Sequence, residues 1–168
     1  MEYKIIIDTR EKKTEHITKQ FDKNNIPYER RKLSVGDYAI QNSDGVTPPV
    51  VIERKTSLDE LIGNLIDKKP HDGHNNRFIR EIIAAEALGY KLIILVENAN
   101  YYEDLLKGNY RSKIKPNAAA GLILSLLAKY PHVHIAAVDP SLSASYINRI
   151  LRLHLQEVLK EQSPKNLT

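Results

Sequence analysis

The sequence predicts an α/β fold in which helices flank a mixed central sheet, and three observations support this fold class. Short apolar runs rich in β-branched residues recur along the chain, as expected for buried strands. In the second half these runs alternate with segments of helical apolar spacing, which indicates parallel strands joined by helices. In the first half, turn-forming residues at 42–49 separate two adjacent runs, which indicates antiparallel pairing.

Six strands are expected, each an apolar or β-branched run that ends in charged or turn-forming residues. The run KLIILVE at 91–97 is apolar on both faces, as in a sheet that helices cover on both sides. The segment 28–55 is expected to form an antiparallel meander. The expected strands are residues 3–7, 28–33, 38–40, 50–55, 91–97 and 133–138.

Five helices are expected from apolar spacing and from capping residues. Ile17 and Phe21 are four residues apart, Ser57 followed by Glu60 forms a capping box, and Pro116 suits a first helical turn. The expected helices cover residues 14–24, 57 to about 65, 77–88, 116–130 and 141–161. The segment 68–76 between two of them is expected to be a loop.

Composition narrows the classes of protein that remain. The chain has 168 residues and is 42% hydrophobic, which suits one globular domain, expected at 1–162 with a frayed tail at 163–168. The absence of cysteine excludes disulfides and thiolate metal sites, and no apolar stretch approaches the roughly 20 residues of a membrane span. An intracellular, soluble protein without membrane contact is expected. The net charge of +4 is compatible with a polyanionic partner.

Two acids near the turn at 42–49 predict a catalytic site. If the flanking strands form a hairpin centred on Gly45, Asp37 lies directly across from Glu53. Side chains alternate along a strand, so Lys55 shares the face of Glu53, whereas Arg54 lies on the other face. Two adjacent carboxylates repel one another unless a proton or a cation separates them, and Mg²⁺ suits such a pair. Lys55 would then activate a water molecule or stabilise charge on a phosphoryl group.

Four separated segments carry a family resemblance. GDY at 36–38 with ERKTSLD at 53–59 matches the pattern G-D-x(n)-E-R-K-x-x-x-D, and DTRE at 8–11 matches D-x-R-E. NNRF at 75–78 and the segment 111–135 also match in the same order. Together they resemble the XPF nuclease family, which includes archaeal Hef. The resemblance implies a restriction-endonuclease-like core and a metal-dependent endonuclease that cuts branched, flapped or forked DNA in repair or recombination.

The resemblance also implies site residues by motif position. The acids that would surround Mg²⁺ or Mn²⁺ are Asp8, Asp37 and Glu53. The catalytic set further includes the basic pair and the closing acid of the motif, which are Arg54, Lys55 and Asp59. Glu11 would flank the site, and Arg10 and Arg77 would contact DNA.

Several residues keep a second interpretation. Asp59 lies in the first turn of a helix, where a carboxylate is favourable in any protein. Arg54 could form a structural ion pair with Asp8 or Glu11 instead of contacting phosphate. The basic run Arg111, Lys113 and Lys115 is a candidate DNA contact, but such runs are more often solvated surface. His71, Asp72 and His74 suit a metal by residue type, although a loop with Pro70 and Gly73 favours a simple exposed segment.

The expected partners follow from the resemblance and from the last helix. Family members usually carry a helix-hairpin-helix region after the nuclease core, and this chain is too short to hold one. DNA affinity is therefore expected to depend on a homodimer or on a separate DNA-binding or activating subunit. The apolar stripe of the last helix would form the dimer contact; the alternative is that it packs on its own sheet. A non-catalytic scaffolding subunit is the main rival function, disfavoured because the acids and the ERK run are present.

Overall fold

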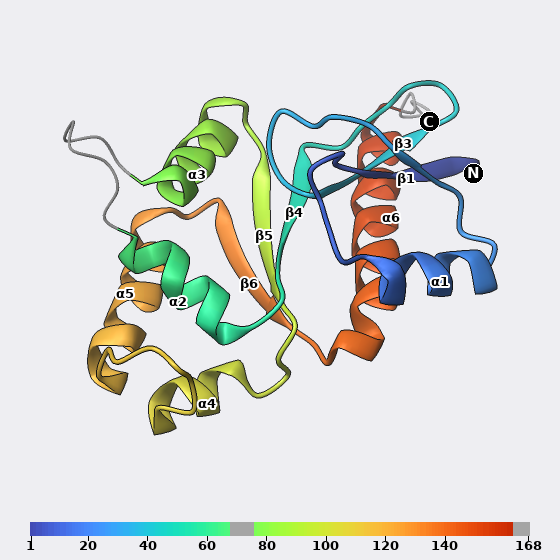
Figure 1. Ribbon diagram of the computed structural model, residues 1–168. Helices are drawn as coiled ribbons and strands as arrows, with labels where there is room; N and C mark the ends of the chain where they lie inside the picture. Colours follow the sequence, from blue (N-terminus) through green and yellow to red (C-terminus); the bar gives the residue numbers. More distant parts are fainter. Residues whose placement is uncertain (68–75, 163–168) are drawn as a thin grey trace.

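Six strands form one mixed sheet in the order β2-β1-β3-β4-β5-β6 (Figure 1). The computed structural model describes residues 1–67 and 76–162. The strands are β1 Tyr3–Ile7, β2 Tyr28–Arg30, β3 Tyr38–Asn42, β4 Val50–Lys55, β5 Lys91–Val96 and β6 Val133–Ala137. The helices are α1 Glu15–Lys23, α2 Leu58–Ile66, α3 Arg77–Ala87, α4 Tyr101–Lys107, α5 Pro116–Lys129 and α6 Ser143–Gln162, with a 3₁₀ turn at Pro140–Leu142. The predicted α/β class with a mixed, helix-flanked sheet is confirmed.

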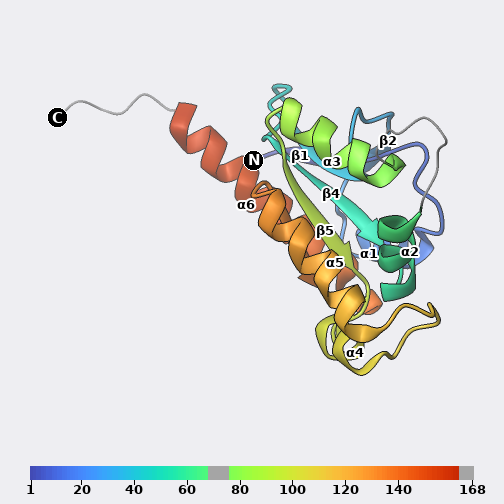
Figure 2. The ribbon, with the colours of Figure 1, turned by 90° about the vertical axis from the view of Figure 1, so that its left-hand side faces the viewer.

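Helices cover both faces of the sheet, as Figures 1 and 2 show. α1 and α6 pack on one face, and α2, α3 and α5 pack on the other. In β1, Ile5 and Ile7 contact the α1/α6 layer while Ile6 contacts the opposite layer, because strand side chains alternate. This two-sided burial is the reason for consecutive isoleucines in the sequence.

The pairing of β2 corrects one expectation. Residues 28–30 pair with β1 in parallel at the edge of the sheet, so the predicted antiparallel meander over 28–55 is wrong for its first strand. The connection from β1 to β2 runs through α1, which makes it a crossover unit like those of the second half. β3 and β4 are antiparallel, and Tyr38 pairs with Ile52 in the register expected for a hairpin centred on Gly45.

One helix was missed, and two predicted features lie outside the described residues. α4 at Tyr101–Lys107 ends at Gly108, whose positive φ of 73° allows the left-handed cap that closes a helix. The short tyrosine-rich sequence hides this helix from a spacing argument. Residues 68–75, which were expected to form a loop and include His71 and His74, and residues 163–168, the expected tail, lie outside the described residues.

The apolar stripe of α6 packs mostly within the chain. Ile147, Leu151 and Leu155 are fully buried against the sheet, whereas Leu153 is 55% exposed. Most of the stripe is thus explained without a second copy, and the homodimer stays a prediction. In the described part of the chain, no helix is long and apolar enough to cross a membrane.

Candidate active site

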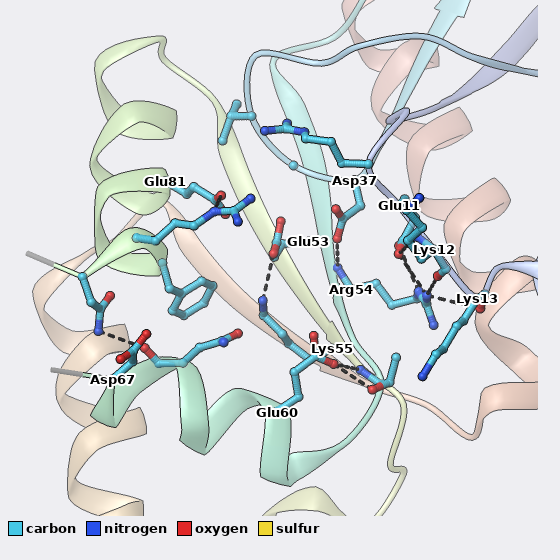
Figure 3. A pocket seen from close by; sticks show the side chains of 18 of the residues that line it. Glu11, Lys12, Lys13, Asp37, Glu53, Arg54, Lys55, Glu60, Asp67 and Glu81 are labelled. Carbon is cyan, nitrogen blue, oxygen red and sulfur yellow. Dashed lines mark hydrogen bonds and ion pairs between the residues drawn. The ribbon is translucent and has the colours of Figure 1, made fainter. Parts of the chain in front are cut away.

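The start of β3 and the end of β4 open into a cavity of about 680 Å³ (Figure 3). Asp37, immediately before β3, and Glu53 and Lys55, in β4, all line it. The remaining walls come from the segment after β1 and from α2 and α3. Asp37, Glu53 and Lys55, from two separate parts of the sequence motif, therefore meet at one cavity.

Gly36 explains why Asp37 reaches β4 so closely. It has a positive φ of 77°, and a Cβ atom built on it would lie 2.8 Å from the Cβ of Val51. Only glycine permits both the left-handed backbone and this close approach. The Asp37 amide then donates to the Ile52 carbonyl at 2.7 Å, while the Asp37 carboxylate accepts from the Arg54 amide at 2.8 Å.

The negatively charged forms of Asp37 and Glu53 are unfavourable at this site. Burial raises the pKa of Asp37 well above its ordinary value, and repulsion from Glu53 and Glu11 raises it further. Burial also raises the pKa of Glu53, although Lys55 opposes this shift. Figure 3 shows Glu53 between Asp37 and Glu81, with Lys55 below it. A bound cation would relieve both penalties.

Lys55 is held by two neighbours. Its Nζ atom donates to Oε1 of Glu53 at 2.8 Å and lies 4.5 Å from the centroid of the Phe78 ring on α3. Both contacts hold the Lys55 side chain at the cavity wall. Lys55 is only 5% exposed, so its amine reaches the cavity from a mostly buried position.

Arg54 points to the opposite side of β4, as the alternation predicts. It is paired with Glu11 after β1 and with Glu97 after β5, and its side chain is 2% exposed. The structural ion pair with Glu11 is thus present, while Asp8 is not its partner. Glu97 was not foreseen, because nothing in the sequence places the residue after one strand beside a motif on another.

Asp8 lies outside the cavity lining, although it was expected at the metal. Its Oδ1 accepts from both the amide and Nε of Arg10, at 2.9 and 2.7 Å, and its Oδ2 accepts from the Leu33 amide at 2.6 Å. These contacts lower the pKa of Asp8 against the opposing effect of burial. Asp8 therefore anchors Arg10, which lines the cavity.

Asp59 and the basic run lie together, away from the cavity lining. Oδ1 of Asp59 accepts from the Arg111 amide at 2.6 Å and from the Ser112 amide at 3.4 Å. Lys113 and Lys115 follow on the same connection between α4 and α5. The closing acid of the motif thus holds a loop in this structure. Arg77 does line the cavity and forms a pair with Glu81 at 3.2 Å.

Other lining residues were missed by sequence reasoning. Phe78 ends the NNRF segment and the others lie within a few residues of a motif, but none was assigned to the site. They include Lys12, Lys13, Glu60, Phe78 and Glu81. Among them, the position of Glu81 follows from helical periodicity, since it lies four residues after Arg77.

The comparisons with known proteins agree with the motifs. The model of the ERCC4 domain matches residues 7–150, which is most of the chain. The chain belongs to the ERCC4 domain family. This is the XPF family of nuclease domains, which are typically structure-specific DNA endonucleases. No curated protein in the comparison matches the chain.

Solved structures of XPF from Aeropyrum pernix share the ERCC4 fold seen here. One is 20% identical with a TM-score of 0.64 and covers 95% of this chain and 70% of that chain. A second, described as a complex with DNA, is 19% identical with a TM-score of 0.64 and covers 92% of this chain and 66% of that one. At these identities the likeness shows the fold.

The donor set of this ERCC4 domain fits a hard divalent cation with few protein ligands. In the described residues, no group of three or more histidine, cysteine, aspartate or glutamate side chains is arranged to hold a metal ion. Mg²⁺ usually keeps several water ligands and needs only one or two carboxylates, which Asp37 and Glu53 provide. Oδ1 of Asp37 and Oε2 of Glu53 accept no hydrogen bond from the described residues, so one oxygen of each remains for a cation.

Proposed function

We propose that this ERCC4 domain is a Mg²⁺- or Mn²⁺-dependent DNA endonuclease whose cation is held by Asp37 and Glu53. The observation that carries the proposal is the pair of buried carboxylates with raised pKa that line one cavity, beside Lys55, whose amine contacts Glu53. A buried acid pair of this kind is costly to the fold and suits a site that binds charge.

In this proposal the side chains that line the cavity have separate roles in phosphodiester hydrolysis. A bound divalent cation supplies Lewis-acid stabilisation of the phosphoryl oxygens and makes water a better nucleophile. Lys55 places a positive charge where negative charge develops on the phosphate. Arg10 and Arg77, on opposite walls of the cavity, would contact flanking phosphates.

Cleavage assays with Asp37→Ala and Glu53→Ala test the proposal. Each change should reduce metal-dependent cleavage by at least about 100-fold, because it removes a ligand of a cation whose contribution is several kcal/mol. Glu103→Gln, on the exposed surface of α4, is the matched control and should retain activity. Full cleavage by both alanine variants would exclude this site.

Calorimetric titration with Mn²⁺ distinguishes an enzyme from a scaffold. The enzyme should bind Mn²⁺ and lose that binding in the Asp37→Ala variant, whereas a scaffold should show no binding that depends on this carboxylate. A panel of flap, fork, junction and linear DNA then tests the substrate class. We propose branched, flapped or forked DNA, on the basis of the family and of the described complex of XPF with DNA.

A further inference from the structure

The segment after β1 places two lysines on the cavity wall. Lys12 and Lys13 are exposed and line the cavity together with Arg10 and Glu11. Figure 3 shows Glu11, Lys12 and Lys13 on the side of Asp37, with Glu53 and Glu81 farther across. This wall is therefore basic where it faces solvent.

Lys12 and Lys13 differ from the other cations of the cavity in their partners. Four lining cations each form an ion pair with a carboxylate: Arg10 with Asp8, Arg54 with Glu11 and Glu97, Lys55 with Glu53, and Arg77 with Glu81. Within residues 1–67 and 76–162, neither Lys12 nor Lys13 forms such a pair. Their ammonium groups are available to an anionic ligand.

Buried Arg54 holds the backbone of these two lysines. Its Nε and Nη2 donate to the two carboxylate oxygens of Glu11, each at 3.0 Å. Nη2 also donates to the carbonyls of Lys12 and Lys13, at 2.8 and 3.4 Å. A rigid guanidinium that grips three successive residues fixes the path of this segment.

Lys13 keeps an unfavourable backbone because of this grip. Its φ is 53°, in the left-handed region, which is unfavourable for a residue other than glycine. Such a conformation persists only where the surroundings determine it, and it often occurs at functional sites. Here the carbonyl contacts with Arg54 are the surroundings that determine it.

Glu97 completes the support from a separate strand. Its amide donates to the Lys55 carbonyl at 2.9 Å, one carboxylate oxygen accepts from Nη1 of Arg54, and the other lies 2.7 Å from Nε2 of His16. The side chain is 3% exposed. β4, β5, α1 and the segment after β1 are therefore tied together through one buried cluster.

The wall formed by α2 and α3 carries several acidic side chains, so DNA should approach along the wall that carries Lys12 and Lys13. α2 and α3 contribute Glu60 and Glu81 to the cavity, Asp67 directly follows α2, and Arg77 on this wall is paired with Glu81. These carboxylates repel a phosphate backbone, whereas two unpaired ammonium groups attract it. A strand that reaches the Asp37–Glu53 pair is thus directed along Lys12 and Lys13.

We propose that Lys12 and Lys13 form a phosphate-binding arm for DNA and that Glu97, through Arg54, is a positioning residue for that arm. This inference rests on the proposed function, since it assumes that the anionic ligand is DNA. It assigns DNA contact to two residues outside the motifs and gives Arg54 a role that does not involve touching the substrate.

The salt dependence of DNA binding tests the arm. Equilibrium binding of a fluorescent flap duplex is measured without added divalent cation, between about 50 and 200 mM salt. The slope of log K against log salt should become shallower by roughly 0.9 for each of Lys12→Ala and Lys13→Ala, one phosphate contact each. The control is the double variant Lys19→Ala with Lys23→Ala on exposed positions of α1, which should keep the wild-type slope. A wild-type slope in the Lys12/Lys13 double variant would overturn the arm.

Glu97→Gln tests the positioning role. The amide keeps an acceptor oxygen for Arg54 and removes the charge, so the variant should fold while holding Arg54 more weakly. Both lysines remain, yet the slope should become shallower by up to about 1.8 because the arm loses its fixed path. Glu97→Asp, which restores the charge, should recover part of the slope. Wild-type slopes in Glu97→Gln would overturn the positioning role, as a purely structural residue would change stability alone.

The two proposals fail separately in these measurements. If no metal-dependent cleavage is found while the lysine variants still change the salt slope, the arm stands and the nuclease assignment fails. If cleavage needs Asp37 and Glu53 but the salt slope of DNA binding is unchanged in the Lys12 and Lys13 variants, the nuclease assignment stands and the proposed phosphate-binding arm is wrong.

Discussion

Neighbouring residues at the end of β4 have opposite surroundings. Arg54 points to one side, where each of its three guanidinium nitrogens donates to a carboxylate or carbonyl oxygen, from Glu11 and Glu97 among others. Glu53 and Lys55 point to the other side, where Glu53 faces Asp37 and both acids have raised pKa values. A single strand thus carries a satisfied charge cluster on one face and an unsatisfied one on the other.

The two faces of β4 separate charges that stabilise the fold from charges that suit ligand binding. On the Arg54 face, buried charges are matched and serve to fix the backbone. On the Glu53 face, Asp37 is buried near Glu53 while the Lys55 amine pairs with Glu53 and not with Asp37, which is unfavourable for the isolated fold. The unfavourable burial of Asp37 and Glu53 thus lies at the position where a bound cation would relieve it.

Removing the satisfied charge should have the largest effect on stability. Arg54→Met leaves Glu11 and Glu97 buried without their partner, and breaking such a cluster costs about 3–5 kcal/mol. Urea denaturation of the wild type and the variant measures this loss. Arg77→Met is the matched control, because Arg77 is 74% exposed in its ion pair and should change stability by less than about 0.5 kcal/mol. Equal losses in the two variants would contradict the contrast between the faces.

Removing an unsatisfied charge should have the opposite sign. Asp37→Asn relieves repulsion with Glu53, so the metal-free variant should be more stable than the wild type at neutral pH. Because the folded-state pKa values of Asp37 and Glu53 are raised, the folded protein binds more protons than the unfolded chain at pH values above about 4. Wild-type stability should therefore decline as pH rises through those raised pKa values, by at most about 1.4 kcal/mol per pH unit for each proton.

Thermal melts across pH 4–8, with and without Mn²⁺, check this expectation. Asp37→Asn should flatten the decline in metal-free buffer, and Mn²⁺ should stabilise the wild type but not the variant. A decline that is the same in Asp37→Asn and wild type would place the titrating group elsewhere.

The sequence was sufficient for the fold class and for placing Asp37, just before β3, near Glu53 of β4, because both depend on local patterns. Apolar runs and a glycine-containing turn define the strands, and alternation along β4 puts Glu53 and Lys55 on one face. It was insufficient for contacts made across the sheet. The pairing of β2 with β1, the partner role of Glu97, and the contact of Asp8 with the Leu33 amide join segments far apart in the sequence, which no single segment encodes.

Substitutions of Phe78 test the surroundings of Lys55 on the cavity face of β4. Their expected effect is smaller than those of Arg54 and Asp37. Phe78→Leu removes the ring that lies 4.5 Å from the Lys55 ammonium, an interaction of roughly 1 kcal/mol. The cleavage rate should fall about 5-fold, while Mn²⁺ affinity, which depends on Asp37 and Glu53, stays unchanged. Phe78→Tyr keeps the ring and should retain the rate. Single-turnover cleavage and Mn²⁺ titration separate the two effects, and an equal loss of rate in both variants would exclude the cation–π contact as the cause.

Substitutions of Asp59 should have the smallest effect. They test whether Asp59 belongs with the acids whose hydrogen bonds are satisfied or with Asp37 and Glu53. It is an acid of the sequence motif, yet its carboxylate accepts from the Arg111 and Ser112 amides outside the cavity lining. Asp59→Ala should lower stability by about 1 kcal/mol through those two hydrogen bonds and leave Mn²⁺ affinity within about 2-fold of wild type. Asp59→Asn keeps an acceptor oxygen, so it should lose less stability than the alanine variant. A loss of Mn²⁺ binding in Asp59→Ala as large as in Asp37→Ala would instead place Asp59 with the unsatisfied acids. Otherwise this carboxylate serves by holding the backbone of Arg111 and Ser112 in place.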